Sequence, residues 1–389
     1  MFKYKLNTTG SILITALIIL TVLSFFCLFI FRQIINYSST TKHFINNLKS
    51  DALQESAKNI GIVYIKNSIN EILNEPKYIV QKEIKIKDNQ FTLNVEWLEY
   101  PQKIKLTAGY LNSSKMSNSQ DYLILIYSPF IYQISAFENL EISADLNSKN
   151  VITSYYGKTL KMQLTDTRNM IFFTPWKNVK TPENILRNSN IKYSLNEYNF
   201  ELSELEHYSK IADIELEENY IANRTFAKNI IYKNGDLILR NCALDSCLLI
   251  VTGNLTIEEN FSITGTDKYI FDTDQYFEIV PFKNLKTKTN ESKQSIDFIP
   301  RNKYKVKLEK NTSAVKRSFS KISTLPAIIC GDEIFMNLSS NKDIPENTAN
   351  ISGCIYGKNK LSIRNMNKNI KNIFFISNNI KIIGNYSSK

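Results

Sequence analysis

The carboxylates with the most suggestive spacing are Asp267, Asp272 and Asp274. Such a cluster could supply the acid and base of glycoside hydrolysis or the ligands of a calcium ion. However, aspartates also gather at glycine-rich turns for conformational reasons, and the sequence carries no nucleophile elbow, phosphate-binding loop or metal-ligand spacing. Only two histidines are present, His43 and His207. We therefore expect no enzyme activity, no cofactor and no metal site.

The five cysteines divide by position. Cys27 falls within an apolar segment and is interpreted as an inert small residue. The other four form two couples that are close in the chain, Cys242 with Cys247 and Cys330 with Cys354. Our first expectation is a disulfide in each couple. Four reduced, buried thiols are the alternative, because spacing alone does not decide the pairing.

The formal charge of +11 is concentrated in one segment. Residues 281–324 contain twelve Lys or Arg against three Asp or Glu, whereas the rest of the chain has 36 against 34. Alternate basic residues in this segment fall on one face of an expected strand; they are Arg301, Lys303, Lys305 and Lys307. We favour the solvated face of an inserted hairpin. The alternative is a strip that binds an anionic polymer, anionic lipid or nucleic acid.

The element expected to position the rest of the chain lies at the N-terminus. Residues 11–31 carry no charge and are long enough to cross a bilayer at ~1.5 Å per residue. The run is longer than a usual signal-peptide core and lacks a small-x-small cleavage site, so we interpret it as an anchor. Lys3 and Lys5 precede it and Arg32 follows. This pattern predicts a cytoplasmic leader and an extracytoplasmic remainder.

A polar segment with helical periodicity follows without a break over residues 32–75. Small or apolar residues recur every three or four positions along it; they are Ile45, Leu48, Ala52, Ser56, Ile60 and Val63. Pro76 ends the pattern, because its ring and missing N–H do not continue the helical hydrogen bonding. We expect this stripe either to pack the helix on its own domain or to pack against neighbouring helices in a polymer.

The remainder of the chain has the periodicity of β-strands. Residues 77–225 predict a β-rich or α+β middle domain, with a hairpin over 84–97 that turns at Asp88-Asn89. Residues 121–127 predict a buried strand. We find no motif in this middle region that can be attached to chemistry.

From residue 226 to 389 the pattern changes. Gly235 and Gly253 stand eighteen residues apart, and each is followed by Asp or Asn and then by alternating aliphatic residues. Such spacing is typical of the stacked coils of a parallel β-solenoid, and an antiparallel sandwich is the alternative. The predicted fold class is therefore α+β: a long N-terminal helix, a β-rich middle domain and a mostly β C-terminal domain, interrupted by the basic insertion at 281–324.

The start of the chain resembles the type III signal of prepilins, with a basic leader over residues 1–10, Gly10 at the scissile position and an apolar helix behind it. The resemblance implies that a prepilin peptidase cuts between Gly10 and Ser11 and that the new Ser11 amine is methylated. Where major pilins carry Glu at the fifth mature position, Thr15 stands here. This departure resembles PilX-type minor pilins and the tip pseudopilins of type II secretion. It suits a subunit without a neighbour above it, because an unpaired charge in an apolar core is costly.

Two internal segments are also similar to the PilX-type group. Residues 57–64, AKNIGIVY, resemble the AAEAG-like segment of its upper helix, and residues 206–213, EHYSKIAD, with the IIYKNGDLIL run that follows, resemble the entry into a β-solenoid. The resemblance covers about the first 75 residues and, more loosely, residues 205–265 and 326–384.

The resemblance implies a structural minor pilin or pseudopilin that primes or caps a type IV pilus or a related secretion filament. Its implied partners are other pilin-like subunits through the N-terminal helix, the membrane and a prepilin peptidase. Its implied location is the cell membrane, crossed once, with the C-terminal part outside and displayed on a pilus or the cell surface. The alternative is an uncleaved, membrane-anchored β-solenoid that binds or adheres by itself.

Overall fold

The computed structural model describes most of the chain between Thr8 and Gly384. It confirms a long N-terminal apolar helix followed by a β-rich remainder. The described residues are 8–111, 117–143, 151–163, 170–175, 191–194, 198, 200–202, 205–273, 276–281, 304–310, 325–338, 351–364 and 373–384.

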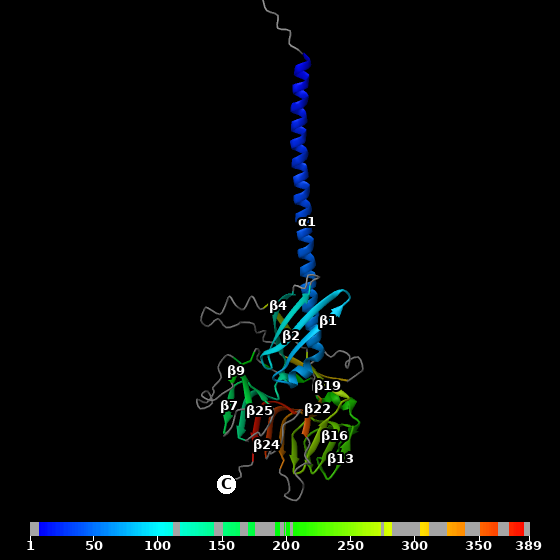
Figure 1. Ribbon diagram of the computed structural model, residues 1–389. Helices are drawn as coiled ribbons and strands as arrows, with labels where there is room; N and C mark the ends of the chain where they lie inside the picture. The colour runs from blue at the N-terminus through cyan, green and yellow to red at the C-terminus, as the bar shows by residue number, and fades with distance from the viewer. Residues whose placement is uncertain are drawn as a thin grey trace, which may run out of the picture.

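Helix α1 (Thr8–Asn74) is one uninterrupted element of 67 residues. At 1.5 Å per residue it is about 100 Å long, and most of it stands clear of the body as a single rod (Figure 1). The expected apolar and polar segments therefore form one helix, and it ends two residues before Pro76, as the ring of that proline requires.

An antiparallel sheet receives the lower part of α1. Its strands lie in the order β1 (Ile79–Ile86), β2 (Asn89–Glu99), β3 (Lys103–Leu111), β4 (Ser117–Tyr127) and β20 (Tyr276–Pro281). The expected hairpin is β1–β2, and Ile86 pairs with Asn89, so the turn residues are Lys87 and Asp88. The strand expected at 121–127 is part of β4.

Below this sheet lies a region of parallel strands (Figure 1). Chain segments stack in three columns. The strands β25, β5 and β16 each take part in two of them, and β24 takes part in all three. The first column runs β11 (Ile214–Glu215), β14 (Ile230–Lys233), β16 (Ala243–Val251), β22 (Pro326–Cys330), β24 (Ile351–Arg364), β25 (Ile373–Ile383), β5 (Ile134–Ser143), β6 (Ile152–Tyr156), β8 (Met170–Thr174) and β9 (Ile191–Tyr193). The second runs β12 (Tyr220–Ala222), β15 (Leu237–Arg240), β17 (Leu255–Glu258), β23 (Glu333–Asn337), β24, β25, β5 and β7 (Thr159–Met162). The third runs β13 (Thr225–Ala227), β16, β18 (Ser262–Gly265) and β24.

Glycines mark corners between these strands, as their spacing predicted. Gly235 has a φ of +88°, a conformation that a residue with a Cβ rarely adopts. The N–H of Gly253, one layer further along, donates to the carbonyl of Gly235 at 3.1 Å. The Asp236 carboxylate accepts a hydrogen bond from the Asn254 N–H at 2.7 Å. The Gly-Asp and Gly-Asn pairs therefore lie on top of each other in successive layers.

Strand pairing crosses residue 225, where we expected one domain to end. Strand β25 pairs in parallel with β5, and Phe375 lies opposite Ile134. Residues 77–225 thus contribute β1–β4 to the antiparallel sheet and β5–β9 to the parallel columns. Alternating hydrophobicity predicted these strands, but it does not say which strand is the neighbour of which.

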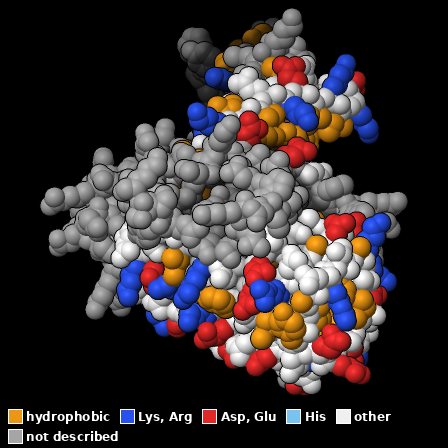
Figure 2. Space-filling model, turned by 90° about the horizontal axis from the view of Figure 1, so that it is seen from below, with side chains coloured by type: hydrophobic (Ala, Val, Ile, Leu, Met, Phe, Trp, Pro, Cys, Tyr) orange, Lys and Arg blue, Asp and Glu red, His pale blue; other side chains and the backbone are white. Residues whose placement is uncertain are grey.

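Aliphatic side chains fill the interior of the parallel columns. Leu239, Ile257, Met336 and Ile363 are successive partners in the second column and are all fully or almost fully buried. The outer surface is different. Seen from below, Lys and Arg side chains lie among Asp and Glu side chains, with small apolar patches between them (Figure 2).

Replacing Ile363 with Ala is expected to lower the free energy of unfolding by about 2–5 kcal/mol, because it leaves a cavity between neighbouring layers. Ile363 has 0% exposure. Its neighbour Ser362 points outward, so Ser362→Ala is the matched control and should change stability by less than about 0.5 kcal/mol. Denaturant unfolding of the detergent-solubilised chain compares the two. Equal effects would contradict the interior placement of Ile363.

Candidate assembly surface on the N-terminal helix

One face of α1 packs on the antiparallel sheet. Its residues recur every three or four positions and have at most 1% exposure; they are Ala57, Ile65, Ile69 and Ile72. Gly61 belongs to the same face and is buried. A Cβ on Gly61 would lie 2.7 Å from a methyl of Leu106 in β3, so the missing side chain lets helix and sheet approach closely. These docking residues are absent from the stripe that the sequence analysis selected.

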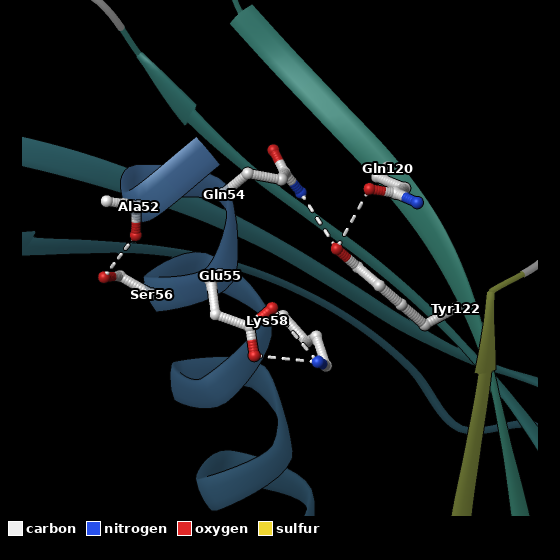
Figure 3. Close-up of polar contacts among 7 residues, drawn as sticks. All are labelled: Ala52, Gln54, Glu55, Ser56, Lys58, Gln120 and Tyr122. Carbon is white, nitrogen blue, oxygen red and sulfur yellow. Dashed lines mark hydrogen bonds and ion pairs between the residues drawn. The ribbon is translucent and has the colours of Figure 1, made fainter. Parts of the chain in front are cut away.

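Polar contacts mark the level at which α1 leaves the sheet. The hydroxyls of Ser50 and Tyr110 lie 2.6 Å apart. Gln54 donates from Nε2 to the Ala108 carbonyl at 2.9 Å and to the Tyr122 hydroxyl at 3.3 Å. Figure 3 shows Gln54 pointing from the helix toward Tyr122, whose hydroxyl in turn donates to Gln120. These contacts fix the helix at its point of exit.

Two aromatic side chains donate to carbonyls at and just beyond the C-terminal end of α1, where helical backbone partners run out. Trp97 Nε1 donates to the carbonyls of Ile72 and Glu75 at 3.3 and 3.0 Å. The Tyr100 hydroxyl donates to the Leu73 carbonyl at 2.7 Å. The two rings meet edge to face, with centroids 5.2 Å apart. The lower end of the helix is therefore fastened to the sheet by side-chain hydrogen bonds as well as by apolar packing.

Alkaline pH is expected to loosen this end of the helix. Burial raises the pKa of Tyr100 from 10.0 to about 12. Because the pKa is higher in the folded state, this stabilisation is complete below the unfolded-state pKa of 10.0 and is lost as pH rises through about 12. Fluorescence of Trp97, measured in a Trp176→Phe background, should report a transition in this range, and Tyr100→Phe should remove it. An unchanged transition in Tyr100→Phe would contradict the assignment.

The stripe that the sequence analysis selected lies on the opposite face of α1. Ile45, Leu48 and Val63 are 56%, 53% and 56% exposed, Ala52 and Ser56 are exposed, and Ile60 is half-buried. At about 100° per residue, the centre of the stripe is roughly 180° from the line of Ala57, Ile65 and Ile72. Of the stripe residues only Ile60 packs against the chain's own core; the first role considered for the stripe, packing on its own domain, is therefore wrong for the other five.

The exposed stripe lies below the apolar surface of the upper helix and ends at Val63. Every large apolar side chain from Ile14 to Ile35 is more than half exposed. Below Val63 the same face carries polar side chains instead, Asn67, Asn70 and Asn74. Residues 38–43 are polar, so the exposed stripe runs from Ile45 to Val63, roughly 27 Å at 1.5 Å per residue.

The N-terminal residues of the expected prepilin signal lie at the start of this rod. Gly10 and Ser11 fall in the first turn of α1, and Thr15 is exposed along it. Residues 1–7 lie outside the described part of the chain. Nothing in the geometry of the described residues tests the predicted cleavage or methylation.

The predicted disulfides do not form, and the alternative of buried thiols describes all four cysteines of the parallel region. Cys354 pairs with Pro326, four residues before Cys330 on β22. Four residues of strand span about 13 Å, too far for a disulfide. Cys242 and Cys247 both direct their Sγ atoms at backbone carbonyls. Burial raises the pKa of Cys330 to about 12, which keeps that thiol protonated.

Of the aspartates considered for catalysis, only the side chain of Asp267 is described, so their role stays a prediction. Asp267 lies in an exposed turn and Asp272 in strand β19 (Tyr269–Thr273), while Asp274 lies outside the described residues. Within the described ranges, no group of three or more His, Cys, Asp or Glu side chains lies close enough together to hold a metal ion.

The basic strip falls partly in a described strand. Lys305 and Lys307 belong to β21 (Tyr304–Lys310), whereas Arg301 and Lys303 lie outside the described residues. Strand β21 pairs antiparallel with β19 and parallel with β10 (Phe200–Leu202). Its backbone is therefore the middle strand of a small sheet. The expected strand is confirmed over Tyr304–Lys310. The favoured solvated face and the alternative of anion binding both stay predictions.

Comparisons with models of protein families, with curated proteins and with solved structures find no match for this chain. The function must therefore be argued from the geometry of α1 and of the body that it carries.

Proposed function

We propose that this chain is a structural, non-enzymatic subunit of a helical filament, a minor pilin or pseudopilin of a type IV pilus or a related secretion system. In this proposal α1 first anchors the chain in the membrane and later packs between the helices of neighbouring subunits. The body stays outside the cell as a displayed head. The observation that carries the proposal is the apolar stripe on the face of α1 that the head leaves uncovered.

The stripe exposes apolar side chains to water, which is unfavourable unless something covers them. Ile45, Leu48 and Val63 lie beyond the segment needed to cross a bilayer, which is about twenty residues long, and each is more than half exposed. Full burial of one such side chain is worth about 1.5–3 kcal/mol. A simple tether gains nothing from apolar residues at these positions, whereas a helix that packs against other helices does.

The upper part of α1 suits a membrane before assembly. Its most apolar 18-residue window has a mean hydropathy of 2.8, although a signal sequence near the N-terminus has the same character. We propose that the chain crosses the cell membrane once, with the leader in the cytoplasm, and that a prepilin peptidase removes residues 1–10. The resemblance of the basic leader, Gly10 and the apolar helix behind it to the prepilin signal supports this order of events, and Thr15 is the position that departs from that signal.

The head suits display outside the cell. We propose that its three columns of parallel strands are the faces of a β-solenoid, because successive layers repeat at eighteen residues in Ile231–Leu249 and Leu237–Leu255. Its charges of both signs are interspersed on the outer surface seen in Figure 2, which favours solubility.

Leader removal and filament recovery test the proposal. In a host that contains a prepilin peptidase, N-terminal sequencing and intact mass should show a chain that begins at Ser11 with a methylated amine. The same chain should appear in filaments sheared from the cell surface. A chain that keeps residues 1–10 and remains in the membrane fraction would instead support an uncleaved, anchored β-solenoid that binds or adheres by itself.

A further inference from the structure

A single charged side chain stands in the apolar part of α1. Over residues 6–41 the only charged residue is Arg32. Leu28, Phe29 and Ile35 are three or four positions away, so they lie on the same side of the helix. All three are more than half exposed, and Arg32 is exposed among them. The guanidinium therefore lies on the surface of an apolar rod.

Arg32 is tolerated while α1 crosses a membrane. The uncharged residues 11–31 span roughly 32 Å at 1.5 Å per residue, about the thickness of the hydrocarbon core, so the guanidinium reaches lipid headgroups and water. Assembly changes these surroundings. Residues 17–20 are consecutive and each more than half exposed, so apolar side chains cover every side of the upper helix. Among other helices, an arginine there is unfavourable unless an anion lies beside it.

The chain itself has no anion for this position. The first Asp or Glu in the sequence is Asp51, 19 residues further along α1 and therefore about 28 Å away from Arg32. The upper half of α1 stands clear of the described parts of the body (Figure 1), so these supply no carboxylate there. A second copy at the same level brings only like charges, because residues 1–50 contain Arg32, Lys42 and Lys49 but no Asp or Glu.

A second copy shifted along the axis does not solve the problem. A shift of about 28 Å would bring its Asp51 to Arg32. The same shift would set the polar residues 36–42, NYSSTTK, of that copy beside residues 17–23, LIILTVL, of its neighbour. Polar side chains would then be buried against aliphatic ones without hydrogen-bond partners. The charge distribution therefore favours a neighbour with a different sequence.

We infer that Arg32 pairs with a carboxylate on the apolar helix of a different protein, so that the upper part of α1 packs against this partner and not against copies of its own chain. The partner is defined by its chemistry, an apolar helix that carries an Asp or Glu within its uncharged segment. A guanidinium binds a carboxylate through two parallel hydrogen bonds, which makes the contact selective as well as strong. The inference rests on the proposed function and adds the class of subunit that lies beside the chain.

Removing the charge tests the pairing, because the two outcomes have opposite signs. Arg32→Gln should lower recovery of the chain in sheared filaments at least about tenfold, since it leaves the partner's carboxylate buried without a cation. Where no carboxylate lies beside Arg32, the same substitution removes an unfavourable charge, and recovery should be unchanged or higher. That result would overturn the inference.

Lys42→Gln is the matched control for this variant. Lys42 is exposed in the polar segment that follows, so its replacement should leave filament recovery within about twofold of the unchanged chain. Both variants should reach the membrane fraction in the same amount and lose residues 1–10 equally, which separates a defect in assembly from a defect in insertion.

Photo-crosslinking identifies the neighbour independently of the substitution. Benzoylphenylalanine is placed at Phe29, one turn from Arg32, and assembled filaments are irradiated and analysed by mass spectrometry. The linked peptide should come from another protein and contain an Asp or Glu within an uncharged apolar segment. Neutralising that carboxylate should lower recovery as Arg32→Gln does, and the two changes together should lower it no further than either alone. A peptide from this chain, a linked peptide without a carboxylate, or a link to lipid alone would overturn the inference.

The unchanged chain distinguishes this inference from the proposed function. If the unchanged chain keeps residues 1–10 or is absent from filaments, the proposed function fails and the pairing fails with it. If the unchanged chain is cleaved and recovered in filaments and Arg32→Gln is recovered equally well, the proposed function stands and only the pairing of Arg32 fails.

Discussion

Replacing Leu48 with Asp is expected to remove the chain from assembled filaments while leaving its head folded. Leu48 is 53% exposed in the single chain and lies on the face of α1 that does not touch the sheet. In the proposed filament, the substitution places an unpaired carboxylate in an apolar helix–helix interface. Because ~1.4 kcal/mol corresponds to a factor of ten and burying such a charge costs more, recovery in sheared filaments should fall at least about tenfold.

Asn47→Asp is the matched control for this variant. Asn47 is exposed one residue away but points toward the opposite side of α1, so its recovery should stay within about twofold of the unchanged chain, since surface substitutions shift free energies by about 0.5 kcal/mol or less. The midpoint of denaturant unfolding should be the same for both variants. Normal filament recovery of Leu48→Asp would remove the main support for an assembly role of the stripe.

Replacing Gly61 with Leu is expected to lower the stability of the head, which Leu48→Asp should leave unchanged. Any Cβ on Gly61 falls 2.7 and 2.8 Å from the two methyls of Leu106, which is fully buried. Overpacking of this kind costs about 1–3 kcal/mol or more. It should also push the helix away from β3 and break the contacts of Ser50 and Gln54 at the helix exit. Lower stability in denaturant and faster proteolysis between α1 and β1 would report the change.

Two further variants make the Gly61 result interpretable. Asn59→Leu adds the same side chain on an exposed turn of the same helix and should be nearly neutral. Leu106→Ala makes room at the contact, so in combination with Gly61→Leu it should recover part of the lost stability. A Gly61→Leu chain as stable as the unchanged one would show that helix and sheet are not as closely packed as described.

Local sequence rules predicted the local elements well. Helix α1 follows from the uncharged segment, the periodic segment behind it and Pro76, all of which act within a few residues. The β1–β2 hairpin follows from strict alternation around a polar turn, although the turn lies one residue earlier than expected because Lys87 adopts the left-handed conformation, with φ of 52°. These features depend on neighbours in the chain, so a single sequence contains their causes.

The side of α1 that docks on the head was not predicted. The helix carries two periodic faces, and the exposed one has the larger aliphatic side chains near its start. The docking face uses the small residues Ala57 and Gly61 before Ile65, Ile69 and Ile72. Small residues give little hydrophobic signal, and their role appears only when Leu106 of a distant strand is seen against them.

The sequence likewise did not predict which distant segments of the chain are neighbours in the fold. The eighteen-residue glycine repeat indicated parallel layers, and Gly235 and Gly253 do lie on adjacent layers. Nothing in the periodicity of residues 134–143 indicates that β25 is their partner. The cysteine couples were misjudged for the same reason, because closeness in the chain was taken for closeness in space. Cys354 lies opposite Pro326, four residues along β22 from Cys330.

The pairing of β25 with β5 also governs when the head can fold. Asn139 and Asn379 are 240 residues apart and share a hydrogen bond, so the layers built from β5 to β8 gain their neighbour only after β25 has been made. Contacts of such long range slow folding. Until β25 is in place, the edge of β5 that it covers stays without its partner strand.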